Sequence, residues 1–200
     1  GNQMQAEFIT NFDALYIIVF QVLVSSIVMR WKALSSMIRG IIISSIGMAL
    51  TLMTQNVVFI LAAMLIFSIG EMMASPKISE YIGRIAPADK KALYMGYSFI
   101  PMFLGNVFAG IISGNVYQSI SDKHSLVKRE MAQRGLSFSE NLTQNEYFKA
   151  AADALSMDER QFTDFLWDTY QPSNIWIIIM AIGLVAAICL WIYHRKLLKD

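Results

Sequence analysis

The sequence predicts an all-α integral membrane protein with five transmembrane helices and a helical extracytoplasmic insert. Hydrophobic residues make up 56% of the 200 residues, and charged residues make up 16%, against a typical share of about 25%. Of the 16 basic and 15 acidic residues, six and nine lie within 118–172, so the rest of the chain is strongly apolar. This composition excludes a nucleic-acid-binding domain, and the single cysteine, Cys189, excludes an intrachain disulfide.

Five apolar runs are long enough to cross a bilayer, because about 20 helical residues span a hydrocarbon core of about 30 Å. They show no sustained alternation of apolar and polar residues, so we expect helices and not barrel strands. The alternative, buried helices of a soluble protein, fits five such runs in one short chain poorly. The predicted spans are 8–29, 37–53, 57–75, 93–117 and 175–193.

Basic residues alternate between the loops, which predicts the orientation of the spans. The loop 54–56 carries no charge and the segment 118–172 is acidic, whereas the connections after the first and third spans and the tail are basic. We therefore expect a cytoplasmic C-terminus, an extracytoplasmic 118–172 segment and a location in a bacterial inner (plasma) membrane. An odd number of spans that starts outside predicts at least one further helix upstream. The basic residues counted are Arg30, Lys32, Arg39, Lys77, Arg84, Lys90, Lys91, Arg195, Lys196 and Lys199.

The segment 118–172 has the pattern of short capped helices. Ser121 or Asp122 is suited to cap a helix that runs to Arg134 and stops at Gly135. Two capping-box spacings follow, Thr143 with Glu146 and Ser156 with Glu159.

The second of these boxes opens a predicted helix over 157–170, which Pro172 terminates. The segment is interpreted as a lid that packs on itself or on the membrane surface, or alternatively as a docking site for a partner. The apolar residues at helical spacing in this last helix are Phe162, Phe165, Leu166 and Tyr170.

Two acidic residues lie inside predicted spans, and an ionisable residue there is a functional candidate by default. Asp13 lies in the first two turns of the first span, and Glu71 lies deep in the third. No Lys or Arg lies at matching depth in the five spans. The two carboxylates therefore pair with groups in a missing part of the protein, bind a cation or carry a proton.

Neutral polar residues and prolines also interrupt the spans. Ser98 and Asn106 are suited to hydrogen bonding between helices, and Pro101 and Pro76 are predicted to kink their helices. No metal-ligand, phosphate-loop or catalytic residue set is present, so we expect no enzyme, no bound metal and no cofactor besides a proton gradient.

Several short motifs lie at a family-specific spacing. The third and fourth spans carry Gly70-Glu71-x-x-x-Ser75-Pro76, Ala86-Pro87, Met95-Gly96, Gly105-Asn106 and Gly110. This pattern resembles helices 10 and 11 of the proton-dependent oligopeptide transporters, which belong to the major facilitator superfamily. The run that begins at Asp13 resembles helix 8 of the same family.

The resemblance implies that the chain is helices 8 to 12, a partial C-terminal half of such a transporter. Residues 1–117 would hold helices 8–11, 118–172 the insert, and 173–200 the last helix and tail. The implied function is proton-coupled symport of small peptides by alternating access, together with the missing N-terminal half and the lipid bilayer.

The candidate site residues follow from the same resemblance. Glu71 and Asp13 would carry the coupled proton and lie near the amino end of the peptide. Asn106 and Ser98 complete the candidate substrate-binding set. The alternatives are a carrier for another small solute, such as a cation, and a transporter-like scaffold that binds a partner through 118–172.

Overall fold

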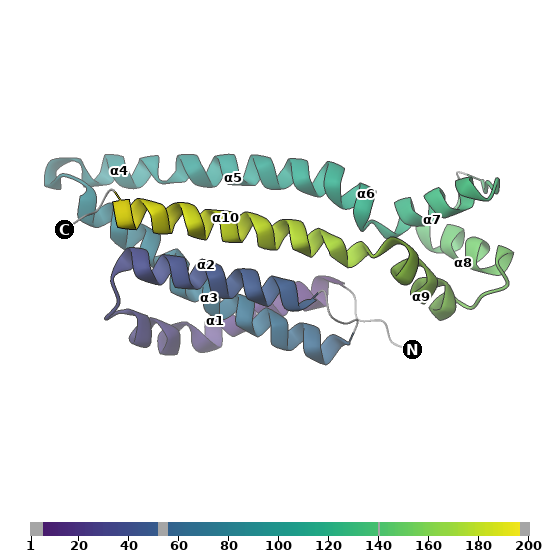
Figure 1. The fold of residues 1–200 in the computed structure, drawn as a ribbon, viewed down its shortest axis with the longest axis horizontal. Coiled ribbons are helices and arrows are strands. Elements are labelled where there is room, and N and C mark those ends of the chain that lie inside the picture. Colours follow the sequence, from purple (N-terminus) through teal and green to yellow (C-terminus); the bar gives the residue numbers. More distant parts are fainter. Residues whose placement is uncertain (1–5, 52–55, 140, 197–200) are drawn as a thin grey trace. The chain divides into compact units, whose positions relative to one another are not determined.

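The computed structural model describes residues 6–51, 56–139 and 141–196, and these residues form helices without strands (Figure 1). Within these ranges, five helical segments are long and apolar enough to cross a membrane, which confirms the predicted fold class. The end of the predicted span 37–53, and Lys199, fall outside the described residues. The α-helices are α1 (Ala6–Val28), α2 (Ala33–Leu50), α3 (Val57–Ile85), α4 (Lys91–Tyr97), α5 (Phe99–Ile111), α6 (Gln118–Ile120), α7 (Lys123–Gln133), α8 (Gln144–Ala154), α9 (Glu159–Tyr170) and α10 (Ile175–Lys196).

The chain divides into two compact units. The first comprises Gly1–Leu104 together with Trp176–Asp200, and the second comprises Gly105–Ile175. The first unit holds α1 to α4, the beginning of α5 and nearly all of α10, whereas α6 to α9 belong to the second.

The closest helix pair of the first unit is α2 with α3, and small residues allow their backbones to touch. A Cβ atom added at Gly40 would lie 2.6 Å from the carbonyl oxygen of Gly70. A Cβ atom added at Gly70 would in turn collide with the backbone nitrogen of Ser44. Buried Ser36 donates a hydrogen bond to the Met73 carbonyl at 2.8 Å across the same contact. Small residues and interhelical hydrogen bonds are the usual means of packing helices in lipid.

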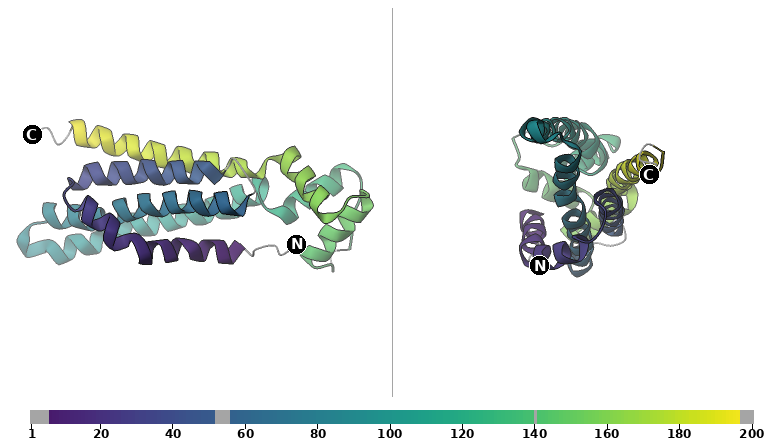
Figure 2. Two further views of the ribbon diagram at one scale, coloured as in Figure 1. Left: turned by 90° about the horizontal axis from the view of Figure 1, so that it is seen from below. Right: turned by 90° about the vertical axis from the view of Figure 1, so that its left-hand side faces the viewer.

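Helices α1 and α10 run alongside this pair (Figure 2). The Tyr16 hydroxyl of α1 donates to the Leu61 carbonyl of α3 at 3.3 Å. On the other side, Gly183 of α10 lies directly against the Ser45 side chain of α2. The hydroxyls of Tyr81 and Tyr193 are 2.9 Å apart and join α3 to α10.

Helix α3 is ten residues longer than the predicted span 57–75. Asn56 caps its first turn by accepting a hydrogen bond from the Val58 amide at 2.9 Å. The helix ends at Ile85 because Pro87 disfavours helical backbone at Ala86, which is extended with ψ of 133°. It continues through Pro76 without a break, so the predicted kink there stays a prediction.

The next membrane-spanning stretch is interrupted between α4 and α5, at Ser98. Pro101 lies three residues later, and it lacks the amide hydrogen that would bond the carbonyl of Tyr97 in a regular helix. The interruption therefore falls where the proline removes the hydrogen bond. Further along, residues Ile112–Tyr117 form a π-helical segment.

Helices α7, α8 and α9 form a small bundle with its own apolar core, which we call the α7–α9 insert (residues 123–170). Phe162 and Leu166 are buried in that core, and Phe165 and Tyr170 pack against it, as predicted. The remaining buried members of the core are Val127, Met131, Tyr147, Phe148, Ala151 and Ala152.

Two of the three predicted caps in the insert are confirmed. The Asp122 side chain accepts the Ser125 amide at 2.8 Å and starts α7. Gly135, with φ of 70°, follows the end of that helix. Thr143 and Glu146 form the expected capping box at the start of α8.

The predicted box of Ser156 with Glu159 is wrong. Ser156 is left-handed, with φ of 55°, and its amide bonds the Asp153 carbonyl at 3.0 Å. The Met157 amide bonds the Ala152 carbonyl, so these residues terminate α8 in a Schellman motif. The N-cap of α9 is instead Asp158, whose capping-box partner is Gln161.

Candidate functional site

The two acidic residues of the predicted spans lie on two helices that pack against each other, α1 and α3. The carboxylate oxygen Oδ1 of Asp13, on α1, lies 2.5 Å from the hydroxyl oxygen of Ser68 on α3. Ser68 is fully buried. Asp13 therefore reaches from its own helix onto the neighbouring helix and finds a hydroxyl donor there.

Glu71 lies three residues after Ser68, so it is less than one helical turn further along α3. Its side chain is half-buried, and the charge of Asp13 acts on it through space. Within the described residues, the Glu71 carboxylate makes no hydrogen bond and no ion pair. Two neighbouring carboxylates in a low-dielectric site disfavour the state in which both are charged.

Lys77 is a buried basic residue that was assigned to a loop because the predicted third span ended at residue 75. It lies within α3, six residues after Glu71, and is 5% exposed. Its ammonium group donates to Glu80 at 2.6 Å and to the Trp31 carbonyl at 3.3 Å. Because these partners engage Lys77, it ties the α1–α2 turn to α3 and leaves the carboxylate pair without a basic partner among the described residues.

The structure records no contact between the carboxylate pair and Ser98, the other predicted site residue of the first unit. The Ser98 hydroxyl donates to the Met95 carbonyl of its own helical segment at 2.6 Å. Asn106 is exposed on α5 and belongs to the second unit. The described geometry of the site therefore consists of Asp13, Ser68 and Glu71.

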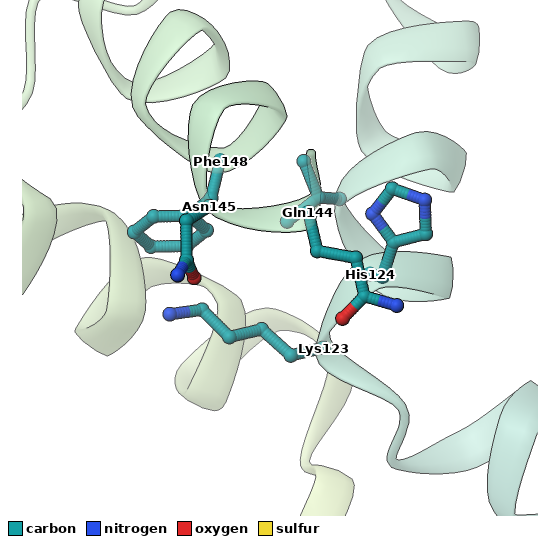
Figure 3. A pocket seen from close by; sticks show the side chains of 6 residues that line it. Lys123, His124, Gln144, Asn145 and Phe148 are labelled. Carbon is teal, nitrogen blue, oxygen red and sulfur yellow. The ribbon is translucent and has the colours of Figure 1, made fainter. Parts of the chain in front are cut away.

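A small cavity of about 50 Å³ lies in the second unit, between the first turns of α7 and α8 (Figure 3). The Lys123 ammonium group lies 3.4 Å from the centre of the Phe148 ring. Both helix starts are already capped by the chain itself, by Asp122 and Thr143. The cavity therefore lies between two helix N-termini whose backbone amides are already capped by side chains of the protein itself. Its lining residues are Lys123, His124, Val127, Gln144, Asn145 and Phe148.

Comparison with known proteins identifies the family. The model of the Major Facilitator Superfamily matches residues 2–125, which is more than half of the chain. The chain belongs to this superfamily. It is 28% identical over 106 residues to a protein of Bacillus subtilis (strain 168) named "Uncharacterized MFS-type transporter YttB". That match covers 50% of this chain and 27% of the relative, and no solved structure matches the chain.

The superfamily match and the five apolar helical segments among the described residues together identify an integral membrane protein. The superfamily match reaches residue 125, so it covers α1 to α6 and ends at the start of α7. Asp13, Ser68 and Glu71 all lie within the matched part.

Ser68 is the residue that sequence reasoning missed at this site. A serine in an apolar helix is common, and residue type alone does not distinguish Ser68 from Ser36, Ser44 or Ser45. The only available signal is its position on the same helix face as Glu71, three residues away.

Proposed function

We propose that the chain is part of a proton-coupled secondary transporter in which Asp13 and Glu71 carry the coupled proton. The observation that supports this proposal is the carboxylate pair without a basic partner among the described residues. Such a pair favours binding of one positive charge, because a proton or a cation relieves the repulsion between the two carboxylates. Coupled movement of a small solute would follow by rocking of the two halves of the full transporter.

The solute proposed first is a small peptide, in keeping with the resemblance to oligopeptide transporters. The α-ammonium group of a peptide is a cation that a carboxylate pair can hold in a low-dielectric cavity. The same chemistry supports a second candidate, a carrier of another cationic solute. Competition between dipeptides and simple amines for uptake separates these two candidates.

The test is uptake of a labelled dipeptide into liposomes that contain the full-length protein, driven by an imposed proton gradient. We expect Glu71→Gln and Asp13→Asn each to reduce gradient-driven uptake by at least about tenfold, because each removes a proton-binding carboxylate. Asp89→Asn is the matched control, since Asp89 is an exposed acid in the turn after α3. Uptake that persists unchanged in both carboxylate variants would overturn the proposal.

A panel of labelled amines in place of the dipeptide covers the second candidate. Gradient-driven uptake of an amine, with no dipeptide uptake, would assign the carboxylate pair to a cationic solute. Absence of uptake for every solute, with no proton flux across the liposome membrane, would reject transport by this site.

A further inference from the structure

The Ser68 hydroxyl has two hydrogen-bond partners and one hydrogen to give. Its oxygen lies 2.5 Å from Asp13 Oδ1 and 2.8 Å from the carbonyl oxygen of Met64, one turn earlier on α3. A serine hydroxyl donates one hydrogen and accepts two, whereas a carbonyl oxygen and a charged carboxylate only accept. Ser68 is 0% exposed, so bulk water supplies no second donor.

The charge state of Asp13 decides how this shortage is resolved. When Asp13 is charged, the hydroxyl hydrogen points to the carboxylate, because a charge-assisted hydrogen bond is about twice as strong as a neutral one. The bond to Met64 is then lost or weakened. When Asp13 is protonated, its own O–H donates to the Ser68 oxygen, and the serine hydrogen is released to the Met64 carbonyl. Both contacts are then full hydrogen bonds.

We propose that Ser68 is a positioning residue that transmits the protonation state of Asp13 to helix α3. The inference rests on the proposed function, because it gives Asp13 the role of a proton carrier. Protonation reverses the direction of the Asp13–Ser68 hydrogen bond and adds a bond to the α3 backbone at Met64. Glu71 lies on the same helix, three residues from Ser68, so the second carboxylate is held by the helix whose bonding changes.

The other ionisable groups near Asp13 do not replace Ser68 as its hydrogen-bond partner. On α3, Glu71 is the ionisable residue that interacts with the charge of Asp13. On α1, the Tyr16 hydroxyl is engaged with the Leu61 carbonyl. Helix α2 packs on α3, and its ionisable residue, Arg39, lies 4.6 Å from the centre of the Trp31 ring.

The test combines infrared spectroscopy with transport, on the full-length protein in liposomes. The carbonyl stretching band of protonated Asp13 is assigned in the difference spectrum between low and high pH, by its loss in Asp13→Asn. We expect Ser68→Ala to shift this band, because the acid loses its acceptor, and to lower gradient-driven uptake by about tenfold or more. Substrate exchange without a gradient should be affected much less.

Two further variants separate this role from a loss of packing. Ser68→Thr keeps a hydroxyl at the position and should restore the band and most of the uptake. Ser36→Ala is the matched control, because Ser36 is equally buried and donates to a backbone carbonyl, that of Met73, and not to a carboxylate. It should leave the Asp13 band unchanged, and thermal unfolding checks that each variant is folded.

The outcomes distinguish this inference from the proposed function. If Asp13→Asn abolishes coupled uptake while Ser68→Ala changes neither the band nor the uptake, Ser68 has no positioning role and the proton carrier stands. If Asp13→Asn leaves both the low-pH spectrum and the uptake unchanged, the proton carrier itself is rejected. If Ser36→Ala shifts the Asp13 carbonyl band as much as Ser68→Ala does, the shift comes from altered packing and the inference is rejected.

Discussion

Glu130 is a buried carboxylate on α7, and its partners show how single side chains hold the α7–α9 insert together. It is 5% exposed and accepts from the Arg134 guanidinium at 2.6 Å and from the Tyr170 hydroxyl at 2.6 Å. A buried charge requires such partners, because an unpaired one loses its hydration without compensation. Tyr170 lies at the end of α9, so its hydroxyl joins the last helix of the insert to the first.

Tyr170→Phe should therefore weaken the insert by about 1–3 kcal/mol, because the buried carboxylate of Glu130 loses one of its donors. Hydrogen exchange of residues 123–170 in the full-length protein measures the local unfolding free energy. Tyr147→Phe is the matched control, since Tyr147 is also buried in the insert but its hydroxyl has no hydrogen-bond partner among the described residues. Equal destabilisation by the two substitutions would contradict the role given to the Tyr170 hydroxyl.

The same hydrogen bond predicts a pH dependence. Burial, followed by the hydrogen bond to Glu130 and the Glu130 charge, raises the pKa of Tyr170 to about 12. The unfolded value is about 10, so the stabilisation is fully present below pH 10 and is lost as the pH rises towards 12. The local unfolding free energy of the insert, measured by hydrogen exchange, should therefore fall over that range in the unsubstituted protein. Tyr170→Phe should remove the share of this pH dependence that comes from the Tyr170 hydroxyl.

At the candidate site, sequence reasoning singled out two acids and missed the serine that is bonded to one of them. An acid in an apolar span is conspicuous because it is costly there, which is why Asp13 and Glu71 became site candidates. Ser68 is small and neutral, and its importance comes from a hydrogen bond across 55 positions of sequence. A long-range contact of this kind requires the packing of α1 on α3, which no local pattern specifies.

Among the elements, the α2–α3 pair depends on close backbone contact. Gly40→Ala places a Cβ atom 2.6 Å from the Gly70 carbonyl and 2.9 Å from the Ala74 amide nitrogen, so the two helices must separate. We expect a loss of about 1–3 kcal/mol, measured as a lower Tm of the full-length protein in detergent.

Gly83→Ala is the matched control on α3, because an added Cβ there meets nothing within 4 Å. It should be neutral or should raise the Tm, since alanine favours helix over glycine by about 1 kcal/mol. A Tm for Gly40→Ala equal to that of the unsubstituted protein would show that the two helices tolerate separation.

The element boundaries that were mispredicted have local physical causes. The third span was ended at residue 75 because Pro76 and Lys77 follow, yet Lys77 continues the helix by bonding Glu80 and the Trp31 carbonyl. Ser156 has the spacing of an N-cap, but it terminates α8, and Asp158 takes the capping role two residues later. Two helices joined by a very short connection compete for the same residues, and spacing alone does not assign them.

At the scale of the whole molecule, the apolar runs were enough to predict five spans, because hydrophobic length is dictated by the bilayer. The internal core of the α7–α9 insert was also predictable in part, since its apolar residues recur at helical spacing. The tertiary contacts of Asp13 and Lys77 were not, because they join helices that are distant in sequence.

The two functional hypotheses for the whole molecule differ in what the insert does. The Ser121 hydroxyl donates to the Pro172 carbonyl at 2.5 Å, so the chain enters and leaves the insert at adjacent points. Because the insert also has its own core, a flexible linker of about four residues can replace 122–171 without stretching the chain.

The transporter hypothesis then predicts that gradient-driven uptake survives the deletion and is lost in Glu71→Gln. The scaffold hypothesis predicts the reverse, with partner binding lost on deletion and kept in Glu71→Gln. Because a deletion that unfolds the protein would mimic the scaffold result, thermal unfolding of the shortened protein is measured first, and only a folded sample decides between the two.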